Sequence, residues 1–120
     1  MGDLTIEQQS LSNEKIKSYS FLNCMYNDAY YPNFLVGKCE QILLGFCIDI
    51  ETIKPENLDA LYKLSHKSIE LINALEVEFN QNDSEIETVA RECLAENFEF
   101  IAIAYGFNAD IEALIATREW

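Results

Sequence analysis

Apolar side chains recur at three- and four-residue intervals over most of this chain, which is the spacing of one face of an α-helix. The two clearest segments are residues 32–52 and 55–80, and each begins at a proline, a residue that suits the first turn of a helix. No segment shows the alternation of apolar and polar residues that predicts a strand. The apolar face of the first segment consists of Leu35, Cys39, Ile42, Leu43, Phe46, Cys47 and Ile50.

The C-terminal third carries signals for the start and the end of a helix. Ser84 and Glu87 have the spacing of a capping box, which predicts that a helix begins at Ser84. This helix is expected to continue to Tyr105, because Gly106 suits the left-handed conformation that often follows a last helical turn. A final short helix is expected over residues 108–116.

The N-terminal residues show a weaker pattern. Residues 1–12 are polar and unpatterned, so we expect a mobile tail, followed by a helix over residues 13–25 and a loop over residues 26–32. Short connections between successive helices imply antiparallel neighbours. We therefore predict an all-α fold, a compact up-down bundle of four main helices plus a short C-terminal helix, with residues 13–120 as a single helical domain.

The chain has 120 residues and a formal net charge of -13, and the charge is unevenly distributed. Residues 1–75 contain ten acids and six lysines, whereas residues 76–120 contain eleven acids and only two basic residues, Arg91 and Arg118. Nucleic acids and anionic membranes should repel such a chain. Two interpretations stay open: the acidity maintains solubility, or it attracts a basic protein partner.

The four cysteines are Cys24, Cys39, Cys47 and Cys93, and none forms a C-x-x-C pair. Three of them lie among apolar residues, so we expect reduced, buried thiols that pack as small hydrophobic side chains. The first residues lack the basic and apolar regions of a signal peptide, and no apolar run is long enough to span a membrane. These features favour a cytoplasmic protein.

Motifs for catalysis or metal binding are weak. The only histidine, His66, lies at the edge of an apolar helical face, with Glu70 one turn away. Di-iron helical bundles instead use Glu-x-x-His pairs on two helices, and glycine-rich phosphate loops are also absent from this sequence. We therefore expect no enzyme and no cofactor, and keep a small enzyme or metal-dependent protein using His66 and Glu70 as an alternative.

Four glutamates form the most informative surface pattern. On a continuous helix, Glu92, Glu96 and Glu99 lie within about 40° of Glu85 around the axis. The pattern predicts one acidic line that is either a solvated face or a contact surface for a cationic partner. Asn97 lies on the opposite, apolar side, where its amide is expected to hydrogen-bond to another helix or to a backbone group.

The loop expected over residues 26–32 contains Asp28, Tyr30 and Tyr31. Tyrosine is enriched at the centres of protein interfaces, so these three residues are candidate contacts for a protein partner. The alternative is that both rings close the end of the bundle, with their hydroxyls in contact with water.

Two stretches carry a resemblance to known proteins. The segment MYNDAYYP and the segments DSEIETVARE, AYGF, ADI and REW resemble an uncharacterised family of small acidic bacterial proteins. The resemblance covers roughly residues 24–120, and it implies one helical domain and no assigned activity. The pattern of Asp28, Tyr30, Tyr31 and Pro32 is also similar to a Tyr-Tyr-Pro segment beside acids in bacteriocin immunity proteins, which neutralise basic nuclease toxins.

The sequence therefore favours a non-enzymatic protein that binds and neutralises a cationic toxin or effector. Its candidate contacts are Asp28, Tyr30, Tyr31, Glu85, Glu92, Glu96 and Glu99. The other alternative, besides the enzyme, is a structural or accessory subunit of a homo-oligomer. We expect a monomer or a homodimer.

Overall fold

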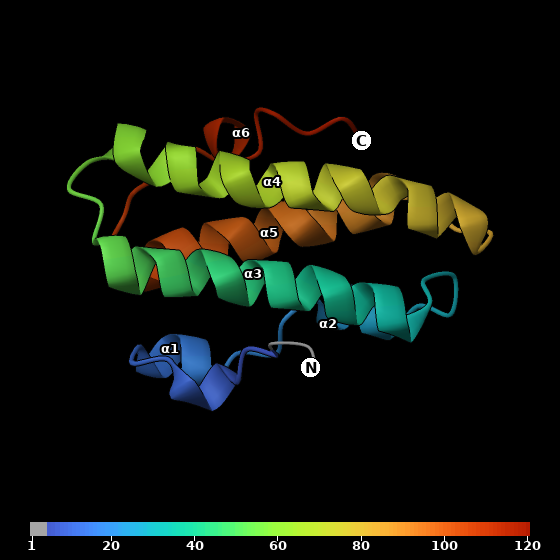
Figure 1. The fold of residues 1–120 in the computed structure, drawn as a ribbon, viewed down its shortest axis with the longest axis horizontal. Helices are drawn as coiled ribbons and strands as arrows, with labels where there is room; N and C mark the ends of the chain where they lie inside the picture. The colour runs from blue at the N-terminus through green and yellow to red at the C-terminus, as the bar shows by residue number, and fades with distance from the viewer. Residues whose placement is uncertain (1–4) are drawn as a thin grey trace.

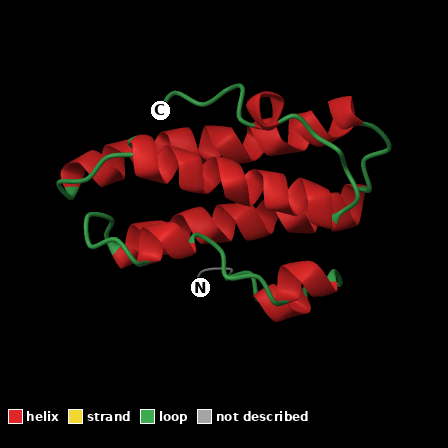
Figure 2. Cartoon of the chain, turned by 180° about the vertical axis from the view of Figure 1, so that it is seen from behind, coloured by secondary structure: helices red, strands yellow, loops and turns green. Residues whose placement is uncertain are grey.

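Three long helices form the body of the protein in the computed structural model, which describes residues 5–120 (Figure 1). They are α3 (Asn33–Ile53), α4 (Leu58–Gln81) and α5 (Thr88–Ala104), and they run alternately in opposite directions. Within the described range every regular element is a helix (Figure 2), so the predicted all-α class is confirmed. None of these helices is long and apolar enough to cross a membrane.

Short helices cover the sides of this body. A 3-10 turn (η1, Gln8–Ser10) precedes α1 (Glu14–Lys17) and α2 (Asn23–Tyr26), and both α1 and α2 contact α5. At the other end of the chain, α6 (Ile111–Leu114) contacts α4 and α5. The core between these elements includes Phe46, Phe79 and Phe98, which are fully buried.

The predicted first helix over residues 13–25 is wrong, because the chain turns between α1 and α2. Leu22 adopts a left-handed backbone with φ of 55°, and its N–H donates to Asn97 Oδ1 at 3.0 Å instead of continuing a helix. Phe21 and Leu22 are both buried. Contacts with α5 therefore override the local helical pattern, and the bundle has three long helices rather than four.

Residues 5–12 also differ from the expected free tail, while residues 1–4 lie outside the described range. The Ile6 N–H donates to Gln41 Oε1 at 2.7 Å, and the Gln41 amide donates back to the Ile6 carbonyl at 3.1 Å. Leu11 is only 1% exposed. Residues 5–12 are thus polar on average, but Ile6 and Leu11 pack against the core and the Gln41 amide of α3 holds the Ile6 backbone.

The predicted capping box at Ser84 is wrong for a reason of backbone geometry. Asp83 is left-handed with φ of 57°, and the Ser84 N–H donates to the Phe79 carbonyl at 2.9 Å. This bond closes the C-terminus of α4 in a Schellman motif, so Ser84 cannot cap the next helix. Helix α5 begins four residues later, after Glu87 in the N-cap position.

Helix α4 also begins later than expected. Its N-cap is Asn57, whose side chain accepts a hydrogen bond from the Ala60 N–H, rather than the residue before Pro55. Such a side-chain cap satisfies a backbone N–H of the first helical turn that has no partner within the helix, and the proline side chain has no oxygen that could accept this bond. The short C-terminal helix is present but spans only Ile111–Leu114, with Asp110 as its cap.

The expected end of α5 at Gly106 is confirmed. Gly106 has a φ of 87°, its N–H donates to Ile103, and the Phe107 N–H donates to Ala102 at 2.9 Å. Both bonds belong to a Schellman motif.

Replacing Gly106 with Ala should lower the free energy of unfolding by about 1 kcal/mol, because a side chain disfavours this left-handed backbone. A Cβ at this position would meet no atom within 4 Å, so the loss is conformational rather than steric. Urea denaturation of both proteins measures it. An unchanged midpoint would contradict the assigned role of Gly106.

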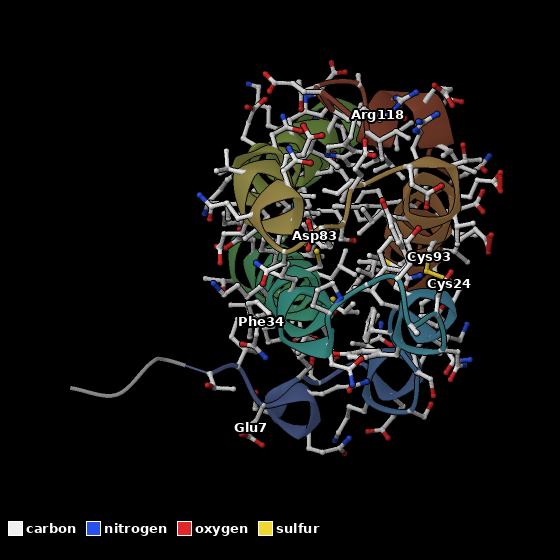
Figure 3. All side chains as sticks on the ribbon, turned by 90° about the vertical axis from the view of Figure 1, so that its right-hand side faces the viewer. Glu7, Cys24, Phe34, Asp83, Cys93 and Arg118 are labelled. Carbon is white, nitrogen blue, oxygen red and sulfur yellow. A yellow bond between two sulfur atoms is a disulfide. The ribbon has the colours of Figure 1, made fainter. Side chains whose placement is uncertain are left out.

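A disulfide joins Cys24 in α2 to Cys93 in α5, with their Cα atoms 6.2 Å apart (Figure 3). The expectation of reduced cysteines is therefore wrong for these two, because the turn at Leu22 brings Cys24 against α5. Cys39 and Cys47 are free and buried as expected, and burial raises the pKa of both thiols to about 12.

Candidate protein-binding surface at one end of the bundle

The loop between α2 and α3 and the segment before α5 meet at one end of the bundle, the end that faces the viewer in Figure 3. A turn shapes the loop: the Tyr30 N–H donates to Asp28 Oδ1 at 2.9 Å, and the Tyr31 N–H donates to the Asp28 carbonyl at 3.1 Å. Asp28 thus organises the backbone on which both tyrosines sit.

Tyr31 anchors this loop to α5. Its ring is 2% exposed, its hydroxyl donates to Glu87 Oε1, and it accepts a hydrogen bond from the Ala90 N–H at 3.1 Å. This N–H belongs to the first turn of α5, where backbone donors lack helical partners. Burial and the hydrogen bond to Glu87 raise the pKa of the Tyr31 phenol. Tyr31 is therefore too buried to contact a partner, and it instead attaches the loop to α5.

Tyr30 is the exposed member of the pair. Its side chain is 41% exposed, and its ring meets that of Tyr31 edge-on at a centroid distance of 5.1 Å. Partial burial is the largest cause that raises the pKa of the Tyr30 phenol, and the carboxylates of Glu85 and Glu87 raise this pKa further. Tyr30 thus lies within the electrostatic reach of two acids from the segment before α5.

A hollow lies beside this ring, lined by Asp28, Tyr30, Glu87 and Val89. Val89 is 44% exposed, so the hollow combines apolar and acidic groups. We call this region the Tyr30 surface and define it as Asp28, Tyr30, Glu85, Glu87 and Val89.

The four-glutamate line is only partly present. Glu85 precedes α5 and belongs to the Tyr30 surface instead, since the helix begins at Thr88. On α5 itself, Glu92 and Glu96 are exposed and Glu99 is half-buried. These three form the acidic ridge, which continues from the Tyr30 surface along the helix.

The carboxylates of this region take no part in the ion pairs of the described residues. Residues 5–120 contain four ion pairs, and none of them includes a carboxylate of the Tyr30 surface or the acidic ridge. The ridge therefore has no lysine or arginine partner at ion-pair distance among residues 5–120. The pairs are Glu14–Lys17, Lys38–Glu78, Asp49–Lys67 and Glu112–Arg118.

Sequence reasoning missed two members of this surface. Glu87 was assigned to a capping box, although it accepts from the Tyr31 hydroxyl, and Val89 was not among the candidate contacts, although it is 44% exposed. The sequence held one usable signal, the left-handed tendency of Asp83 after Asn82, which would have moved the helix start beyond Ser84.

The prediction that the Asn97 amide is hydrogen-bonded on the apolar side of the helix is confirmed. It is 3% exposed, its Oδ1 accepts from the Leu22 N–H at 3.0 Å, and its Nδ2 donates to the Cys93 carbonyl at 2.7 Å. The amide thus satisfies the backbone of the turn that precedes α2.

Comparison with protein-family models gives one match: residues 15–120 fit the family described as "Family of unknown function (DUF5713)". The chain belongs to this family. No curated protein and no solved structure matches it. The matched range of this DUF5713 protein includes the whole Tyr30 surface and the acidic ridge.

His66 of the DUF5713 protein holds the C-terminal segment. Its Nε2–H donates to the Ala113 carbonyl at 2.7 Å, and the neighbouring Ser65 hydroxyl donates to the Leu114 carbonyl at 2.9 Å. Glu70 is exposed and accepts only from the Asn73 amide, at 3.5 Å, among the bonds of the described chain. Across residues 5–120, no three His, Cys, Asp or Glu side chains are grouped so that they could hold a metal ion.

Glu51 is a second carboxylate with a defined role in this DUF5713 protein. It accepts hydrogen bonds from the backbone of Ser12 and Asn13 and, at 2.5 Å, from the Tyr105 hydroxyl. Burial alone would raise the pKa of this carboxyl, but these donors outweigh it and lower the pKa. Glu51 thereby ties the N-terminal segment to α3 and to the end of α5.

Replacing Glu51 with Gln should lower the free energy of unfolding at pH 7 by about 1 kcal/mol, because charge-assisted hydrogen bonds are lost. A carboxyl whose pKa falls on folding stabilises above its unfolded pKa, here near 4.5, and this contribution disappears as the pH decreases below that value. Urea denaturation from pH 7 down to pH 3 should therefore show the two proteins converging. A difference that stays constant with pH would contradict the assignment.

Proposed function

We propose that this protein binds and neutralises a cationic protein partner, as an immunity-type inhibitor does, and that it catalyses no reaction. One observation carries the proposal: carboxylates that form no ion pair among residues 5–120 lie beside an exposed tyrosine that the fold holds in place. Exposed acids alone serve solubility in many proteins, but the Tyr30 surface adds an aromatic ring and the apolar Val89 to them.

The contacts that hold Tyr30 in place suit a residue that binds a protein partner. Its backbone is fixed by Asp28 and its ring rests against Tyr31, which is itself bonded to α5. A tyrosine that is already ordered loses little conformational entropy on binding, and such residues often dominate binding energy. Tyr30 is therefore the proposed anchor of the interface.

The acidic ridge supplies long-range attraction. Glu92 and Glu96 are exposed on the same helix that carries Val89, so a basic partner approaching the Tyr30 surface also meets the ridge. Clustered charge of one sign accelerates association with an oppositely charged protein, and it disfavours nucleic acid and anionic membranes. The proposal places this encounter in the cytoplasm.

Replacing Tyr30 with Ala tests the anchor. The wild-type protein and the variant are immobilised, exposed to a lysate of the native host, and the bound proteins are quantified by mass spectrometry. We expect a basic protein that the wild type retains and that the variant retains about tenfold less, as for loss of an interface hot spot.

Leu71→Ala is the matched control, because Leu71 is 51% exposed on α4 and does not belong to the Tyr30 surface. It should retain the partner fully. Equal retention by wild type and Tyr30→Ala would overturn the proposal, as would a loss that Leu71→Ala produces equally.

A further inference from the structure

Three links attach the segment of α2 and its following loop to one face of α5. On α5 the attachment points are residues 90, 93 and 97, which lie at the i, i+3 and i+7 positions of a single helical face. The links pair Tyr31 with Ala90, Cys24 with Cys93, and Leu22 with Asn97. Two of them are hydrogen bonds, and the central one is the disulfide (Figure 3).

The attached segment depends on these links for its structure. Helix α2 has only four residues, far fewer than an isolated helix needs to persist in water. Leu22 and Met25 are buried beneath it, so the segment stays associated with the body through its apolar side chains. The links determine how rigidly Asp28 and Tyr30, at its far end, are held against α5.

The disulfide is open to chemical attack from one side. Cys24 is exposed whereas Cys93 is 1% exposed. Thiol–disulfide exchange requires a thiolate to reach one of the two sulfurs, and we infer from the exposure of the two residues that it approaches from the Cys24 side. Disulfides of cytoplasmic proteins are commonly transient and redox-sensing, which fits the compartment of the proposed function.

We propose that the Cys24–Cys93 disulfide is a redox switch that sets how rigidly the Tyr30 surface is presented, a role that rests on the proposed function. The reductant is a cellular dithiol. Its thiolate attacks Cys24 Sγ, the sulfur–sulfur bond breaks, and Cys93 leaves as a thiolate that takes up a proton. The second thiol of the reductant then displaces Cys24. Two electrons pass to the protein, the reductant becomes a disulfide, and Cys24 and Cys93 become thiols.

The switch has a structural consequence that can be measured without any partner. In the oxidised protein, amide hydrogen exchange over residues 22–31 is slow, because opening the segment is limited by the covalent link. After reduction with tris(2-carboxyethyl)phosphine, exchange over the same residues should be about tenfold faster or more, because only the two hydrogen-bonded links and the packing remain. Exchange in the middle of α3 should change much less.

The Cys24→Ser variant gives the matched comparison, since this substitution is at an exposed position. Its exchange over residues 22–31 should equal that of the reduced wild type, and the reductant should not alter it. A thiol count on the denatured wild type should give two thiols before reduction and four after it, the first two being Cys39 and Cys47.

Two results would overturn the switch: four thiols in protein equilibrated with oxidised glutathione, or equal exchange over residues 22–31 in the oxidised and reduced forms. Neither result bears on Tyr30 as a contact, because that is tested by partner retention. Conversely, failure to retain a partner would leave the exchange difference between the redox forms intact.

Discussion

We expect the Cys24→Ser variant to unfold with a free energy about 4 kcal/mol lower than that of the oxidised wild type. The disulfide joins residues separated by 69 positions, and a cross-link of that span removes much of the conformational entropy of the unfolded chain. Because Cys24 is an exposed residue, we expect the loss of the cross-link to account for most of the change. Urea denaturation monitored by circular dichroism measures the change.

The reducing agent supplies the control for this expectation. In its presence, wild type and Cys24→Ser should unfold at nearly the same urea concentration, because both then lack the cross-link. If the two proteins differ by the same amount with and without reductant, the destabilisation comes from another cause and the stabilising role of the disulfide is contradicted.

The Asn97→Ala variant should be less stable than the wild type by about 3 kcal/mol. The substitution removes the acceptor of the Leu22 N–H, which is buried and has no other partner in the described structure. An unpaired buried donor is costly, and the truncated side chain also leaves a cavity between α2 and α5. The measurement is again urea denaturation, under reducing conditions so that the disulfide does not contribute.

Asn108→Ala is the comparison variant, because Asn108 is exposed and its side chain makes no hydrogen bond in the described structure. Its free energy of unfolding should change by less than about 0.5 kcal/mol. A loss in Asn97→Ala that is no larger than the loss in Asn108→Ala would show that the amide does not hold the turn.

The parts of the fold that were predictable from sequence are those that neighbouring residues determine. The apolar spacing of residues 32–52 and 55–80 identified α3 and α4, and the left-handed tendency of glycine identified Gly106 as the end of α5. Each of these signals acts within a few residues along the chain, so no knowledge of tertiary contacts was needed.

The largest errors involve a contact between distant residues or a residue with two possible roles. The helix over residues 13–25 breaks because Leu22 meets Asn97, which is 75 positions away. The pairing of Cys24 with Cys93 depends on that same turn. Ser84 is a residue type that often caps the start of a helix, but its backbone N–H closes the C-terminus of α4 by donating to the Phe79 carbonyl.

The candidate site was predictable to a similar degree. The sequence singled out Tyr30 as a loop tyrosine and Glu85 from helical spacing. The structure places Glu85 before α5, within electrostatic reach of Tyr30. The opposite roles of the two tyrosines were not predictable, because only the position of α5 decides that Tyr31 is buried beneath Tyr30.

The acids of the Tyr30 surface and of the acidic ridge are proposed to attract a cationic partner. The association rate with the captured protein over a range of salt concentrations measures this attraction directly. The double reversal Glu92→Lys and Glu96→Lys changes the acidic ridge. Its matched control, Glu56→Lys with Asp59→Lys, makes the same change in net charge at exposed positions at the opposite end of the bundle (Figure 1).

We expect the ridge reversal to slow association about tenfold or more at low salt, high salt to remove this difference, and the control reversal to have a much smaller effect. Equal slowing by the two reversals would mean that net charge alone acts. An association rate that neither reversal nor salt changes would contradict the claim outright.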